Sequence, residues 1–169
     1  MSKPEVWLRG GVDGVPAHLQ PVAHSLMQCR EELEGLLTGM PSERIWRTCT
    51  NAASIGFHVR HAMGSLDRLF TYARGEMLSE AQRETLAQEL QPDARLTADD
   101  LLAAVDAAVE RALEQLRGTR EDTLTAVRHV GRGRLPSTVL GLLFHAAEHS
   151  QRHVGQAVTT SRLMEASSA

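Results

Sequence analysis

Apolar residues recur every three or four positions along four long stretches of the chain, which is the period of an amphipathic helix. These stretches predict helices over residues 21–37, 54–73, 98–117 and 136–164. In the third stretch the apolar face consists of Leu101, Leu102, Val105, Val109, Ala112, Leu113 and Leu116. Because each helix has one apolar face to cover, the four together predict a four-helix bundle.

The ends of these stretches carry residues that begin and end helices. Thr97 is a predicted N-cap, and Asp99 and Asp100 follow it in a first turn where the helix dipole favours negative charge. Gly75 stands where the second helix is expected to end in a left-handed residue. These signals leave residues 76–95 as a long connection between the second and third helices.

The connections carry their own signals. The sequence Ser79-Glu80-Ala81-Gln82 fits a capping box and predicts a short helix that ends near Leu90. Residues 119–135 have no helical period, so we expect a loop there, and Pro136 suits the first turn of the last helix. Since no strand pattern of useful length is present, the predicted fold class is all-α, with one bundle domain over residues 1–169.

Composition argues against several classes of function. Lys and Arg total 18 against 21 for Asp and Glu, a formal charge of −3, so we expect no nucleic-acid partner. Apolar runs fall far short of the roughly 20 residues of a membrane span, and Met1–Arg9 lacks the apolar segment of a signal peptide. We therefore expect a cytoplasmic protein in which Cys29 and Cys49 stay reduced, with Cys29 buried on a helix face.

Histidine is unusually frequent, with eight residues against six Phe, Trp and Tyr together. His145, His149 and His153 are spaced four apart in the last predicted helix, so they lie along one side of it. Imidazoles at this spacing can bind one metal ion. The helical period places His149 and His153 beside the apolar face, His145 nearer to solvent, and Gln156 on the same flank.

A metal site needs a third ligand, and the second helix has two candidates. His58 lies about 60° from the centre of the apolar face and His61 about 120°, so the period by itself favours His58. Arg68 falls on the polar face of this helix. Periodicity leaves two interpretations equally open, a metal site and a metal-free bundle with structural histidines. The absence of Glu-x-x-His and His-Glu-x-x-His argues against di-iron carboxylate and zinc-protease sites.

Two segments carry a family resemblance. Residues 149–156 read His149-Ser150-Gln151-Arg152-His153-Val154-Gly155-Gln156, which resembles the H-x-x-x-H-R-G-Q segment on the last helix of the DinB/YfiT-like family. Residues 54–61 resemble the second-helix segment of that family. The resemblance extends over the whole chain in helix order. It implies an up-down-down-up bundle with a long crossover between helices 2 and 3, often a homodimer, that holds nickel, zinc or iron with three histidines.

The resemblance also implies which residues form the site. The metal ligands would be His61, His149 and His153, with His58 and His145 as alternates, and Gln156 would orient a molecule bound at the open position. Val154 stands where the family has Arg. The implied function is a metal-dependent thiol S-transferase, using a low-molecular-weight thiol, or a hydrolase of a small molecule. The alternative is a non-enzymatic stress-response or interaction protein on the same metal-binding bundle.

Overall fold

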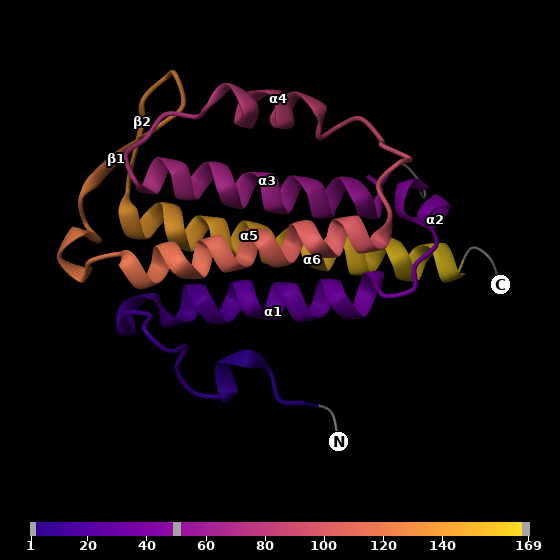
Figure 1. Ribbon diagram of the computed structural model, residues 1–169, viewed down its shortest axis with the longest axis horizontal. Coiled ribbons are helices and arrows are strands. Elements are labelled where there is room, and N and C mark those ends of the chain that lie inside the picture. Colours follow the sequence, from indigo (N-terminus) through magenta and orange to yellow (C-terminus); the bar gives the residue numbers. More distant parts are fainter. Residues whose placement is uncertain (1–2, 49–51, 167–169) are drawn as a thin grey trace.

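The structure is a computed structural model that describes residues 3–48 and 52–166. Its four long helices are α1 (Gln20–Leu37), α3 (Ile55–Ala73), α5 (Ala98–Gly118) and α6 (Val139–Ala166). Figure 1 shows α1 and α6 running in one direction and α3 and α5 in the other. The predicted four-helix bundle with up-down-down-up order is therefore confirmed.

The parallel pair of α3 and α5 requires the chain to return along the whole bundle between them. Residues between these helices make that return on the outside of the bundle and contain the short helix α4 (Glu80–Gln88) (Figure 1). The predicted capping box is present, because Ser79 accepts a hydrogen bond from the backbone N–H of Gln82 and the Gln82 side chain bonds back to Ser79. No residue of α4 is buried.

The predicted ends of α3 and α5 agree with the structure to within one residue. Thr97 caps α5 and forms a second capping box with Asp100, and Ser54 caps α3 by accepting a hydrogen bond from the Phe57 N–H. Gly75 follows α3 with a φ of 83°, a conformation that favours glycine. Shorter elements flank the bundle: η1 (Val6–Leu8), η2 (Ala17–Leu19), α2 (Ser42–Trp46) and η3 (Glu121–Thr123).

The connection before α6 differs from the prediction. Strands β1 (Val127–Val130) and β2 (Leu135–Thr138) form an antiparallel hairpin where a loop was expected. Each strand has four residues, too few for an alternating pattern to stand out. Pro136 lies in β2, which a two-stranded sheet tolerates because each strand has an unpaired edge. The last helix therefore begins at Val139, and Thr138 Oγ1 accepts a hydrogen bond from the Gly141 N–H.

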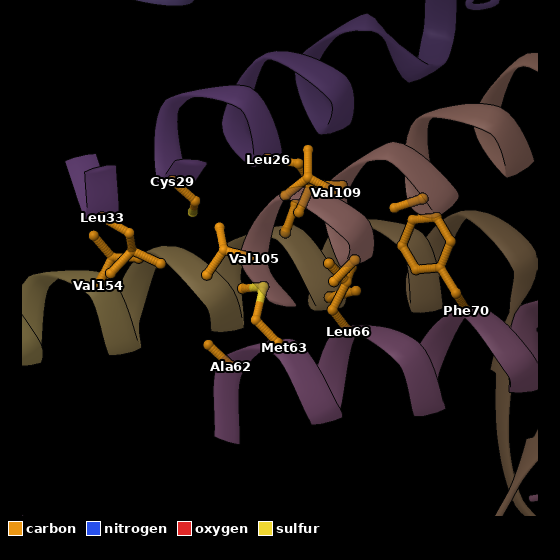
Figure 2. Close-up of a cluster of buried hydrophobic side chains, with 14 of the residues drawn as sticks. Leu26, Cys29, Leu33, Ala62, Met63, Leu66, Phe70, Val105, Val109 and Val154 are labelled. Carbon is orange, nitrogen blue, oxygen red and sulfur yellow. The ribbon is translucent and has the colours of Figure 1, made fainter. Parts of the chain in front are cut away.

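The interior of the bundle is apolar. Figure 2 shows the middle of this interior, where side chains from the four long helices meet, including Leu26, Cys29, Leu33, Met63, Leu66, Phe70, Val105, Val109 and Val154. Cys29 is buried as expected, and this burial raises the pKa of its thiol to about 12, so the thiol stays protonated and unreactive. Cys49 lies outside the described residues.

Among the described residues, every helix is too short or too polar to cross a bilayer.

Candidate metal site

Three histidines from two helices converge at one side of the bundle. His61 comes from α3, and His149 and His153 come from α6. One ring nitrogen from each lies within 4.8 Å of the other two, and His61 Nε2 is 3.1 Å from His149 Nε2. Two nitrogens at about 2.0–2.1 Å from one tetrahedral zinc ion are about 3.3 Å apart. The donor atoms and their spacing therefore fit a single divalent ion.

The packing of α3 against α6 produces this convergence. His149 and His153 are one turn apart on α6, and their ring centroids are 4.6 Å apart. The ring of His61 lies 5.2 Å from that of His149 and 4.6 Å from that of His153. About a quarter of the His61 side chain is exposed to solvent, so a small molecule can reach the cluster.

Two of the three rings make a further contact through the other nitrogen. His61 Nδ1 lies 2.8 Å from Glu89 Oε2, and His153 Nδ1 lies 3.0 Å from His58 Nδ1. These contacts leave the Nε2 atom of each ring for a ligand. Second partners of this kind orient histidine ligands in metal proteins and set which ring nitrogen carries the proton.

Glu89, which follows α4, is buried beneath the cluster with 2% of its surface exposed. Its second oxygen, Oε1, pairs with Arg68 Nη1, while Arg68 Nη2 lies 3.2 Å from Oε2. Burial acts to raise the pKa of Glu89, but the hydrogen bonds from His61 and Arg68 and the charge of Arg68 outweigh it and lower the pKa. Glu89 is therefore a carboxylate at neutral pH.

Burial and mutual repulsion lower the pKa values of His149 and His153 in the cluster and of His58 beside it. The pKa of His153 is lowered to about 4, mainly by burial and then by its histidine neighbours and Arg152. The same two effects lower the pKa of His149, and burial with the nearby His61 lowers that of His58. A neutral imidazole is the form that binds a metal ion, so His149 and His153 need no deprotonation at neutral pH.

The structure separates the remaining candidates from this cluster. His58, which the helical period favoured, is buried against His153 and is not part of the three-histidine group. His145 is half exposed and pairs with Glu148, 2.7 Å away. Gln156 is exposed, and none of the hydrogen bonds between described residues joins it to the histidines.

Two neighbours of the cluster were not foreseen from the sequence. Phe57 stacks on His61 with ring centroids 5.4 Å apart and an angle of 13° between the planes. Glu89 lies 28 residues from His61, in a segment whose period does not relate it to α3. Arg68 was expected on the polar face of α3, and it is buried and paired with Glu89. The contacts of Glu89 with His61 and Arg68 join distant parts of the chain, so no pattern within α3 could have predicted them.

The up-down-down-up bundle and its three converging histidines define a class of helical proteins with a histidine cluster suited to a metal. The chain belongs to the DinB superfamily, whose family model matches residues 25–157. No curated protein matches the chain.

Solved structures share this fold. YfiT from Bacillus subtilis, described as a probable metal-dependent hydrolase with an unusual four-helix bundle topology, is 14% identical, with a TM-score of 0.67 over 95% of this chain and 97% of YfiT. A conserved protein from Enterococcus faecalis is 21% identical, with a TM-score of 0.66 over 86% of this chain and 95% of its own. A DinB-like protein from Bacillus cereus is 13% identical, with a TM-score of 0.66 over 85% and 91%. At these identities the likeness establishes the fold.

Proposed function

We propose that this protein is a divalent-metal-dependent enzyme that activates a small nucleophile for attack on a small molecule. The observation that carries the proposal is the group of His61, His149 and His153, whose ligand atoms lie within 4.8 Å of one another. Three protein ligands leave a coordination position open, which is typical of catalytic zinc sites. A bound divalent ion would lower the pKa of a water or thiol at that position and supply a nucleophile at neutral pH.

The residues around the cluster support this role. Neutral imidazoles leave the full charge of the ion in place, and the low pKa of His153, about 4, means that protons compete weakly for that ligand. Phe57 stacks on His61 and provides an apolar wall next to it. The partial exposure of His61 suits a small substrate that enters from solvent.

Two nucleophiles fit this chemistry. YfiT is described as a probable metal-dependent hydrolase, which favours water. The family resemblance of residues 149–156 also implies thiol S-transferases, in which a low-molecular-weight thiol takes the place of water. We propose water as the first candidate for the nucleophile. The predicted homodimer and the predicted cytoplasmic location are also part of the proposal.

The first test is metal content after purification without a histidine tag. We expect stoichiometric zinc, nickel or iron in the wild-type protein by mass spectrometry and a loss of that metal in His149→Ala. His145→Ala is the matched control, because it removes a histidine of the same helix that pairs with Glu148 outside the cluster. Equal metal content in His149→Ala and the wild type would contradict the site.

The second test separates the two nucleophiles from the non-enzymatic alternative. Hydrolysis of an activated ester and conjugation of a thiol to monochlorobimane are measured with the metal bound and after chelation. Turnover that stops on chelation supports the proposal, and the product identifies water or thiol. Metal binding without turnover in either assay would favour a stress-response or interaction protein.

A further inference from the structure

At the end of α4 the carboxylate of Glu89 is buried, although the apolar side chains next to it are exposed. Glu89 is 2% exposed, whereas its neighbour Leu90 is 75% exposed and Leu86 is 44% exposed. Burying a carboxylate is costly unless it is paired and hydrogen-bonded. Apolar packing of α4 does not account for this placement, because no residue of α4 is buried. The contacts of Glu89 itself must account for it.

Those contacts use both carboxylate oxygens. Oε2 lies 2.8 Å from His61 Nδ1, and both oxygens pair with the guanidinium of Arg68. Arg68 neutralises the charge of Glu89 and fixes its orientation by contacting both oxygens. An ionised carboxylate has only acceptors, so the proton of this contact belongs to His61 Nδ1. In the neutral form of the ring the lone pair is then on Nε2, the atom that lies 3.1 Å from His149 Nε2.

The backbone of α3 leaves room for this arrangement at Gly64. A Cβ atom at Gly64 would lie 2.2 Å from Glu89 Oε1 and 2.8 Å from Arg68 Nη1, distances at which the side chains must move. Gly64 lies one turn after His61 and one turn before Arg68, on the face where the carboxylate approaches the helix. Glycine is less favourable than alanine in the interior of a helix, and here it admits Glu89.

We propose that Glu89 is a positioning residue that holds the ring of His61 with Nε2 directed at the metal site. The inference rests on the proposed function, because His61 must be a ligand for its orientation to matter. Arg68 and Gly64 complete the arrangement: one fixes the carboxylate and the other makes space for it. The crossover segment thus contributes to the site although it supplies no ligand.

The test uses two variants that disturb Glu89 in different ways. Glu89→Gln keeps the shape but adds an N–H donor and removes the charge, so the amide can donate to His61 Nδ1. Gly64→Ala keeps every charged group and displaces the carboxylate by its methyl group. Gly35→Ala is the matched control, because Gly35 is also helical, in the last turn of α1, and a Cβ there meets no atom within 4 Å.

Two measurements are made on each variant. Long-range proton–nitrogen NMR of the metal-free protein reports which nitrogen of His61 carries the proton, and competition with a chromophoric chelator gives the zinc affinity. We expect the Nδ1–H form in the wild type and Gly35→Ala, and a substantial Nε2–H population in Glu89→Gln. We expect zinc affinity to fall about 10–100-fold in Glu89→Gln and Gly64→Ala, the usual effect of losing such a partner.

The outcomes separate this inference from the proposed function. If wild-type protein binds no zinc, nickel or iron, the proposed function fails, while the NMR measurement still tests whether Glu89 sets the proton position. If zinc binds and both variants keep wild-type affinity and the Nδ1–H form, Glu89 has no positioning role. Helical circular dichroism identifies a variant that fails to fold, and Gly64→Ala, which introduces a better helix former, remains as the second test.

Discussion

Neighbouring residues on α3 and α6 belong to two very different regions. On α3, His61 lies in the histidine cluster, whereas the next residue, Ala62, faces the apolar interior (Figure 2). On α6, His153 lies in the cluster, and the next residue, Val154, is in the interior. A rotation of about 100° per residue thus separates the two regions.

The two regions depend on different properties of their side chains. The interior contributes stability through buried apolar area, so its side chains can be exchanged for others of similar volume. The cluster depends on particular nitrogen and oxygen atoms: a change that keeps volume but moves one atom alters its chemistry. We therefore expect mutations in the interior mainly to change stability and mutations in the cluster mainly to change metal binding.

The largest expected change in the free energy of unfolding follows from a mutation in the interior. Leu26 is completely buried, and Leu26→Ala should lower the free energy of unfolding by about 2–5 kcal/mol, because the lost side chain leaves a cavity. Urea denaturation of the metal-free protein measures this change. The zinc affinity of the folded variant should equal that of the wild type. A weaker affinity would mean that the interior and the cluster are coupled.

Acid should destabilise the metal-free protein through the cluster. The pKa of His153 is about 4 in the folded protein and 6.5 as its ordinary value, so the unfolded chain binds this proton first. Stability is therefore complete above about pH 6.5 and falls as pH decreases towards 4, by up to about 3 kcal/mol from this residue. The lowered pKa values of His58 and His149 act in the same direction.

Urea denaturation at several pH values between 7 and 4.5 measures this dependence. Glu89, whose pKa is also lowered, contributes only near the acid end of this interval, where the unfolded chain begins to bind its proton. His153→Gln should flatten the profile, whereas Leu26→Ala should shift it down without changing its slope. An unchanged slope in His153→Gln would show that the acid response originates elsewhere.

Zinc should stabilise the folded protein through the cluster alone. At a free concentration about 100 times its dissociation constant, zinc is expected to raise the free energy of unfolding by about 2.7 kcal/mol. Thermal unfolding with and without zinc should give the same gain in the wild type and Leu26→Ala, and no gain in His149→Ala. A full gain in His149→Ala would place the binding site elsewhere.

The smallest effect is expected at His145, which marks the limit of the cluster. This side chain is half exposed and pairs with Glu148, and its ring lies 5.5 Å from that of His149 without belonging to the three-histidine group. His145→Ala should therefore change the free energy of unfolding by no more than about 0.5 kcal/mol and leave zinc affinity unchanged. A large loss of zinc affinity would extend the cluster by one turn of α6.

Sequence reasoning succeeded where the deciding contacts are local. Ser79 and Gln82 form the predicted capping box three residues apart, and His149 and His153 lie on one side of α6 because of their spacing. It failed at the hairpin of β1 and β2, where strands of four residues are stabilised by pairing with each other. The pattern of apolar residues is too short there to distinguish a strand from a loop.

The choice between His58 and His61 shows that the helical period alone does not predict which histidine of α3 joins the cluster. The period correctly placed His58 nearer the apolar interior, where it is buried. A residue at the edge of the apolar face can still reach a neighbouring helix, and His61 does so across to His149. The family resemblance of residues 54–61 pointed to His61, although the spacing alone favoured His58.

By itself, the sequence determined the four helices, their caps, the long crossover and the pair of histidines on the last helix, because each depends on residues a few positions apart. Only the tertiary structure decided that His61 meets His149 and that Glu89 meets His61, 88 and 28 residues away along the chain. Contacts at such separations depend on how α3 packs against α6 and on where the segment between α3 and α5 passes over α3. That placement results from the packing of all the apolar faces together, which no single segment encodes.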